Sequence, residues 1–245
     1  MDPCHTGRMY GILLGLMVLA AAGLCLWGVK RFVPKYALLP IALTAAVNGI
    51  AYYLPKLLPT GLTPVYMGLE LDEKIPFCPV FIWVYVLSYL QWLVNWVMLS
   101  RQERGFMNRR LAGEWMSKLL CGVCFIFLPT TLKRPVPQTD TFSGCLTALI
   151  YRLDTPVNLF PSIHCLESWL CLRNALSVKK APRWYKPSMV AFALLVLAST
   201  LLVKQHVLLD IPAGILAAEV GIMLGDRLKQ TPFLDKIEAP FLQTA

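Results

Sequence analysis

The chain has 245 residues, of which 57% are hydrophobic and only 15% are charged, and its mean hydropathy is +0.58. This composition is too apolar and too poor in charge for an ordinary soluble domain, so it predicts an integral membrane protein. The net charge of +9 does not indicate nucleic-acid binding, because the basic residues lie in short loops between apolar runs. There they set topology and contact anionic lipid head groups. We expect one membrane domain over residues 1–245, with membrane lipids as partners and no nucleic acid.

Seven apolar runs are long enough to cross the roughly 30 Å of hydrocarbon in a bilayer. In chain order they are 9–28, 36–54, 79–99, 112–128, 161–176, 187–203 and 207–224. The first resembles a signal peptide, but its apolar residues continue beyond the small alanines and favour an uncleaved N-terminal anchor. The fifth is the least apolar, because it contains His164, Glu167 and Arg173. The pattern predicts an all-α, polytopic bundle of six or seven transmembrane helices, with seven preferred.

The orientation follows from the Lys and Arg residues in the connecting loops. Most of them lie after the first, third and fifth runs and in the carboxyl-terminal tail. This bias predicts an outside amino terminus and an inside carboxyl terminus. The loop over residues 133–160 and the turn over residues 204–210 then both face outward.

A polar segment that ends at Asp210 separates the last two apolar runs. If a helix begins near His206, then His206 and Asp210 lie at i and i+4 on one helical face, within hydrogen-bonding reach. A carboxylate beside an imidazole fixes its tautomer and stabilises its cation, which an activated histidine requires. Alternatively, the two residues only cap and solvate a helix end at the membrane interface.

Three polar segments converge on the predicted outer face and together offer cations, a hydroxyl, two imidazoles and a carboxylate. The residues are Lys133, Arg134, Ser162, His164, Lys204, His206 and Asp210. Arg and Lys bind phosphoryl oxygens, while one histidine attacks phosphorus and the other protonates the departing oxygen. This chemistry needs no cofactor, and the sequence lacks the carboxylate cluster typical of a magnesium site. Nor do Cys121 and Cys124 have a second pair or nearby histidines to complete a zinc site.

Over roughly residues 75–225, the expected catalytic core, the chain resembles the type 2 phosphatidic acid phosphatase superfamily of membrane phosphotransferases. The resemblance lies in Arg134-Pro135, in Pro161-Ser162-Ile163-His164, and in Ser199 followed by His206 and Asp210 at the family spacing. It implies that His206 is a nucleophile that forms phosphohistidine and that Asp210 orients it. It also implies that His164 protonates the leaving group and then activates water, while Arg134 and Ser162 hold phosphate.

The sequence departs from the family pattern at three positions. Phe127 stands where the first motif has lysine, so Lys133 would have to replace it from a different angle. Thr200 stands where the third motif has arginine; Lys204 is a candidate to supply that charge, and Thr200 is expected to pack or to bond back to its own helix. Ile163 replaces the glycine of many lipid phosphatases and looks more like inositol phosphoceramide synthase-like transferases.

The function expected from these features is metal-independent hydrolysis of a lipid phosphate, with a phospholipid or other lipid phosphate as substrate. The alternatives are a lipid phosphotransferase of the inositol phosphoceramide synthase-like type, and a non-catalytic seven-span protein with a degenerate motif. We expect the bacterial inner membrane, because the spans are joined by short loops. Glu167 either tunes the protonation of His164 or pairs with Arg173, and we favour the structural role. Glu219 is expected to be a buried partner of another polar residue within the spans.

Overall fold

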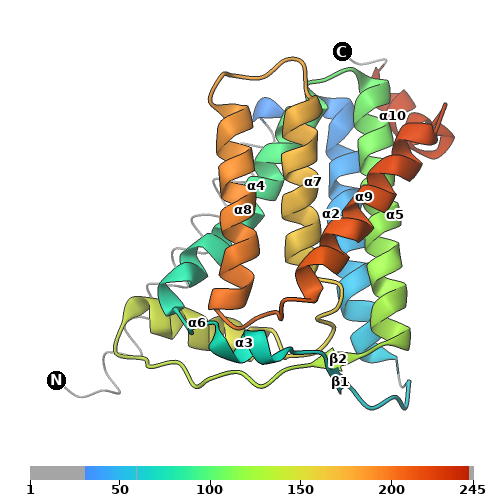
Figure 1. Ribbon diagram of the computed structural model, residues 1–245. Coiled ribbons are helices and arrows are strands. Elements are labelled where there is room, and N and C mark those ends of the chain that lie inside the picture. The colour runs from blue at the N-terminus through green and yellow to red at the C-terminus, as the bar shows by residue number, and fades with distance from the viewer. Residues whose placement is uncertain (1–30, 59, 243–245) are drawn as a thin grey trace.

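The computed structural model describes residues 31–242 except residue 59, and within this part the protein is mostly helical (Figure 1). The prediction of an all-α fold is confirmed. The elements in chain order are α2 (Lys35–Leu57), β1 (Val65–Tyr66), α3 (Glu70–Lys74), the 3-10 helix η1 (Pro79–Phe81), α4 (Ile82–Ser100), α5 (Arg104–Phe127), β2 (Thr130–Thr131), α6 (Phe142–Leu153), α7 (Ile163–Ser177), α8 (Tyr185–Leu202), α9 (Asp210–Arg227) and α10 (Pro232–Leu242). The predicted first span, 9–28, lies outside the described residues.

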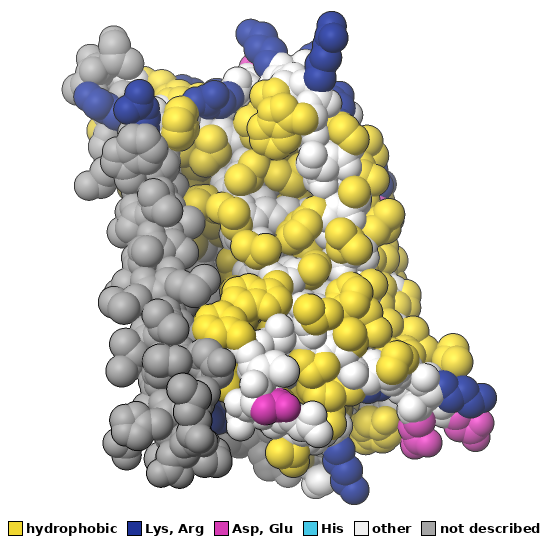
Figure 2. All heavy atoms as spheres, turned by 90° about the vertical axis from the view of Figure 1, so that its left-hand side faces the viewer, with side chains coloured by type: hydrophobic (Ala, Val, Ile, Leu, Met, Phe, Trp, Pro, Cys, Tyr) yellow, Lys and Arg dark blue, Asp and Glu magenta, His cyan; other side chains and the backbone are white. Residues whose placement is uncertain are grey.

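Three of the described helical segments are long and apolar enough to cross a membrane. They are Lys35–Leu57, Pro79–Ser100 and Tyr185–Leu202. Figure 2 shows hydrophobic side chains over most of the described side of the bundle, with Lys and Arg side chains at both of its ends. Such a broad apolar surface is compatible with contact to lipid.

The helices follow the apolar runs closely, with two informative differences at helix starts. Helix α5 begins at Arg104, eight residues before the predicted span, because the polar turns before residue 112 continue the same helix. Helix α9 begins at Asp210 rather than near His206. The expectation that His206 and Asp210 share one helical face is therefore wrong. The chain forms a turn from Val203 to Leu209, and His206 precedes the helix.

The six long helices pack as one bundle, in which α5 lies against α9 and α2, and α7 lies against α8 and α9 (Figure 1). Glycine allows the close approach of α5 to α9. A Cβ atom on Gly221 would lie 2.4 Å from the backbone oxygen of Gly113, and one on Gly225 would lie 2.4 Å from that of Arg109. Because real Cβ atoms do not come so near to a backbone oxygen, these contacts require residues without a side chain.

An ionic cluster occupies the interior of the bundle between α5 and α7. The Lys118 Nζ atom lies 2.6 Å from a Glu114 carboxylate oxygen and 2.5 Å from Glu167 Oε1, and all three side chains are buried. The indole of Trp96 donates to Glu114 at 3.1 Å. Buried charges need such partners because their desolvation is costly. Glu167 thus has the structural role favoured above, but its partner is Lys118.

The partner expected for Glu167, Arg173, instead forms an ion pair with Glu219 of α9. The prediction that Glu219 pairs with another polar residue of the spans is confirmed, but its side chain is 34% exposed and not buried as expected. Trp169 also donates to Glu219, at 2.7 Å. This pair joins α7 to α9.

The two ends of the bundle differ. At one end, here called the α6 end, α3, α6 and a parallel pairing of β1 with β2 lie across the helix termini (Figure 1). At the other, the α10 end, α10 packs against α2. Helices α7 and α9 both begin at the α6 end, so their amino termini and the residues just before them lie close together there.

Candidate active site

The centre of the candidate site is the pair formed by His206 and Asp210. His206 Nδ1 lies 3.0 Å from Asp210 Oδ2, and the same oxygen accepts a 3.0 Å bond from the backbone of Val207. Both side chains are buried, with 8% and 1% exposure. Because the ionised Asp210 carboxylate can only accept a hydrogen bond, Nδ1 of the neutral His206 ring carries the hydrogen and the free lone pair lies on Nε2. The pair has the chemical features of an oriented, activated nucleophile.

His164, the second residue of α7, is the other imidazole at this end of the bundle. The two imidazole ring centroids are 6.3 Å apart. His164 Nδ1 lies 3.2 Å from the hydroxyl of Tyr85, and the two rings stack with centroids 4.0 Å apart. The Nε2 atom of His164 is buried without a partner among the described residues. Tyr85 therefore engages Nδ1 and leaves Nε2 as the nitrogen that exchanges a proton.

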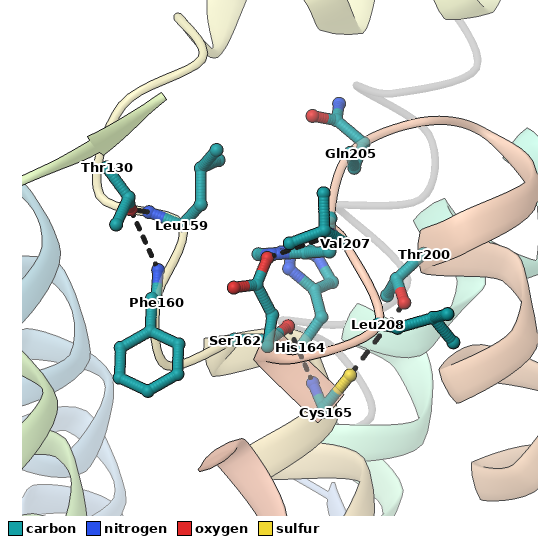
Figure 3. Close-up of polar contacts among 12 residues, drawn as sticks. Thr130, Leu159, Phe160, Ser162, His164, Cys165, Thr200, Gln205, Val207 and Leu208 are labelled. Atoms are coloured by element: carbon teal, nitrogen blue, oxygen red, sulfur yellow. Dashed lines mark hydrogen bonds and ion pairs between the residues drawn. The ribbon is translucent and has the colours of Figure 1, made fainter. Parts of the chain in front are cut away.

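Ser162 caps the amino terminus of α7, beneath the loop that carries Gln205 and Val207 (Figure 3). Its Oγ accepts a 3.2 Å bond from the backbone of Cys165, and its own backbone nitrogen donates to Asp210 O at 3.3 Å. These contacts join the second motif directly to the third. The positive end of a helix dipole favours an anion at this position.

Thr130 of β2 holds the chain that leads into α7. Its Oγ1 accepts bonds from the backbones of Leu159 and Phe160, at 2.9 and 3.1 Å (Figure 3). Arg134 follows four residues after Thr130. The segment that leads to Arg134 is thereby joined to Leu159 and Phe160, which directly precede Pro161 and Ser162.

Arg134 reaches the loop that contains His206 through Gln205. Its guanidinium donates to the Gln205 side-chain oxygen and to the backbone oxygen of Asp154, and it lies over the Tyr151 ring with 4.7 Å to the centroid. Burial lowers the pKa of Arg134, whereas the Asp154 carboxylate raises it. Burial also raises the pKa of Tyr151 to about 12, against the effect of the nearby Arg134. Arg134 is thus oriented toward the segment that contains His206.

The other candidates have different surroundings. Lys133 is exposed, and no hydrogen bond or ion pair joins its side chain to another described residue. Lys204 donates from Nζ to the backbone oxygen of Asp72 at 2.8 Å, so its ammonium is engaged by α3. Thr200 bonds back to Leu197 O at 2.7 Å, as expected. Phe127, which stands where the family has lysine, is 74% exposed.

A cavity of about 340 Å³ adjoins both histidines. Its walls come from α2, α4, α6 and α7 and are rich in aromatic side chains: Tyr52, Tyr53, Tyr85, Tyr89 and Trp92. Asn48 also lines it, and the Oδ1 atom of this residue is buried without a partner among the described residues. Its volume is typical of a small-ligand pocket. The cavity offers room for the alcohol portion of a phosphate ester.

Several site residues were missed by sequence reasoning. Gln205 stands beside His206, and that position was the only signal for it. Tyr85 and Asp72 contact the site from segments more than 70 residues away in the chain. No pattern in a single sequence reveals such contacts.

Comparisons of the chain with protein-family models, with curated proteins and with solved structures find no match. The resemblance to the lipid phosphatase superfamily rests on the three motif segments named above.

Proposed function

We propose that the protein is an integral membrane phosphatase that hydrolyses a lipid phosphate through a phosphohistidine intermediate. The observation that carries the proposal is the His206–Asp210 pair at the same bundle end as His164 and Arg134. The site has an imidazole oriented by a carboxylate, a second imidazole whose Nε2 has no partner within the described part of the chain, and a guanidinium. These are the groups that metal-independent phosphoryl transfer needs.

In the first step, the Nε2 lone pair of His206 attacks phosphorus and the bond from phosphorus to the alcohol oxygen breaks. Protonated His164 gives its Nε2 proton to that oxygen and keeps its Nδ1 proton, which it donates in a hydrogen bond to the Tyr85 hydroxyl oxygen. Asp210 stabilises the positive charge on the phosphorylated ring, and Arg134 neutralises the phosphoryl oxygens. In the second step, neutral His164 takes a proton from water, and the resulting hydroxide oxygen displaces His206 from phosphorus.

We further propose a polytopic arrangement of seven spans, including 9–28, with the α6 end on the outer face of a bacterial inner membrane. The support is the apolar length of three helices and the alternation of helix directions in the bundle. The charge bias of the loops gives the orientation. The substrate then reaches the site from the outer leaflet.

The second candidate function is transfer of a phosphorylated head group to an alcohol. It is favoured by the cavity beside His164, where the walls are aromatic and Asn48 Oδ1 has no partner among the described residues. These features suit an alcohol with hydrogen-bond donors. In this reaction the alcohol takes the place of water in the second step, and the roles of His206 and His164 are unchanged. The third alternative is a non-catalytic protein with a degenerate motif. Phe127 and Thr200, which replace charged residues of the family motifs, support this alternative.

The test is to incubate the purified protein with phosphatidic acid, and separately with a phospholipid plus an alcohol acceptor, in excess chelator. We expect released phosphate in the first reaction. Head-group exchange without phosphate release would instead support the transferase. Absence of both reactions, or activity restored only by added metal, would contradict the proposed chemistry.

A further inference from the structure

The segment from Leu69 to Cys78 lies across the loop that joins α8 to α9. The backbone nitrogen of Cys78 donates to Leu202 O at 2.8 Å, where α8 ends. Further along the same loop, Asp72 bonds to both Lys204 and Leu208. The loop that contains His206 is therefore held at its beginning, its middle and its end by one segment distant in sequence.

Asp72 is the residue that makes most of these contacts. Its Oδ1 accepts a 2.7 Å bond from the Leu208 backbone, its Oδ2 accepts a 2.8 Å bond from the Leu69 backbone, and its own backbone oxygen accepts the Lys204 ammonium at 2.8 Å. The residue is 7% exposed. Hydrogen bonds to a buried carboxylate are among the stronger ones in proteins, so these contacts constrain the loop firmly.

The loop requires such a constraint, because it has no regular secondary structure of its own. Lys204 has a φ of +49°, a left-handed conformation that is unfavourable for a residue with a side chain. Such conformations persist where the surroundings determine them. The hydrogen bond from Lys204 to Asp72 helps to hold Lys204 in this conformation, two residues before His206.

The same loop also carries Gln205, which binds Arg134. A displacement of the loop would thus move the nucleophile and one support of the guanidinium together. A misplacement of about 1 Å in a catalytic group costs roughly 100-fold in rate.

We propose that Asp72 is a positioning residue that holds the Lys204–Leu209 loop in place. In this position His206 Nε2 can attack the same phosphoryl group whose oxygens Arg134 binds. The inference rests on the proposed function for its catalytic consequence, but its structural part does not depend on any activity. It also gives Lys204 a role within the loop, as the residue whose ammonium binds the Asp72 backbone.

The test compares Asp72→Ala and Asp72→Asn with Glu73→Ala, an exposed neighbour that loses the same charge. Hydrogen–deuterium exchange of peptides covering residues 203–209 reports the loop directly. Exchange should be faster in Asp72→Ala than in the wild type or Glu73→Ala. Asp72→Asn should be intermediate, because its amide oxygen still accepts one of the two backbone bonds.

Steady-state kinetics on phosphatidic acid test the consequence for His206. We expect kcat to fall about 10- to 100-fold in Asp72→Ala with KM unchanged, because Asp72 does not touch substrate, and we expect partial recovery in Asp72→Asn. Unchanged exchange in the alanine variant would overturn the structural claim. Faster exchange with an unchanged kcat would overturn the positioning role. A wild-type protein without activity would contradict the proposed function, while the exchange comparison would still decide whether Asp72 holds the loop.

Discussion

The two histidines of the site differ in the group that binds Nδ1 of each ring. His206 faces the carboxylate of Asp210, whereas His164 faces the hydroxyl of Tyr85. A carboxylate stabilises a positively charged imidazole more strongly than a neutral hydroxyl does. A phosphorylated imidazole carries a positive charge, so the ring beside Asp210 suits the nucleophile and the ring beside Tyr85 suits the proton donor. In the proposed reaction the two histidines therefore have different roles that cannot be exchanged.

Replacement of His164 should affect substrates according to their leaving group. In His164→Asn, kcat on phosphatidic acid should fall by about 10²- to 10⁴-fold, because no group protonates the departing oxygen. With p-nitrophenyl phosphate, whose leaving group needs no proton, the first step should survive. A burst of nitrophenol followed by slow turnover would then be seen in stopped-flow absorbance. Equal losses with both substrates and no burst would contradict the acid role.

At the residue scale, the sequence predicted the pairing of His206 with Asp210 but not its local geometry. Helical spacing was the argument for the contact, yet the carboxylate reaches the ring from the first residue of α9 across a turn. The engagement of Lys204 by Asp72 depends on a contact across 132 residues of chain. The spacing of neighbouring residues in the sequence contains no information on such a contact. The contact of Tyr85 with His164 could not be predicted for the same reason.

At the element scale, hydropathy located the long helices because a long, nearly continuous apolar run is typical of a helix that crosses a membrane. The described bounds of α2, α7 and α8 lie within three residues of the predicted ones. Hydropathy did not reveal α3, α6 and α10. The first is only five residues long, and the other two are short helices at the ends of the bundle.

The contact between α5 and α9 makes a prediction from paired substitutions. Gly221→Ala should lower the free energy of unfolding by about 1–3 kcal/mol, because the new methyl group would overlap the Gly113 backbone. The new methyl group of Gly49→Ala in α2 would meet no atom of the described residues within 4 Å, so this substitution should be neutral or stabilise by up to about 1 kcal/mol. Denaturant titration in detergent measures both. Equal effects of the two substitutions would contradict the close packing of α5 on α9.

At the scale of the whole molecule, the bundle separates its charges from its apolar surface. Basic side chains gather near the α10 end, in the loops after α4 and α7 and at the end of α9. They include Arg101, Lys179, Lys180, Arg183 and Arg227. The proposed site lies at the opposite end. The positive-inside rule therefore predicts that the α10 end lies in the cytoplasm and that the proposed site faces outward.

Reporter fusions test this orientation. Alkaline phosphatase fused after Asp140, in the loop that follows Arg134, should be active, because it folds only outside the cytoplasm. The same enzyme fused after Ala245 should be inactive, whereas a fluorescent protein fused there should fluoresce. The reverse pattern would contradict the outward-facing site and leave the chemistry to be sought on the cytoplasmic side.

The central claim is that His206 forms a covalent bond to phosphorus. The most direct measurement is to mix the protein with phosphatidic acid labelled in its phosphate, quench in alkali and map the labelled peptide by mass spectrometry. We predict an acid-labile, alkali-stable phosphoryl group on His206, absent in His206→Asn and present in the wild type. Phosphate release without any label on His206, or full turnover by His206→Asn, would contradict the account.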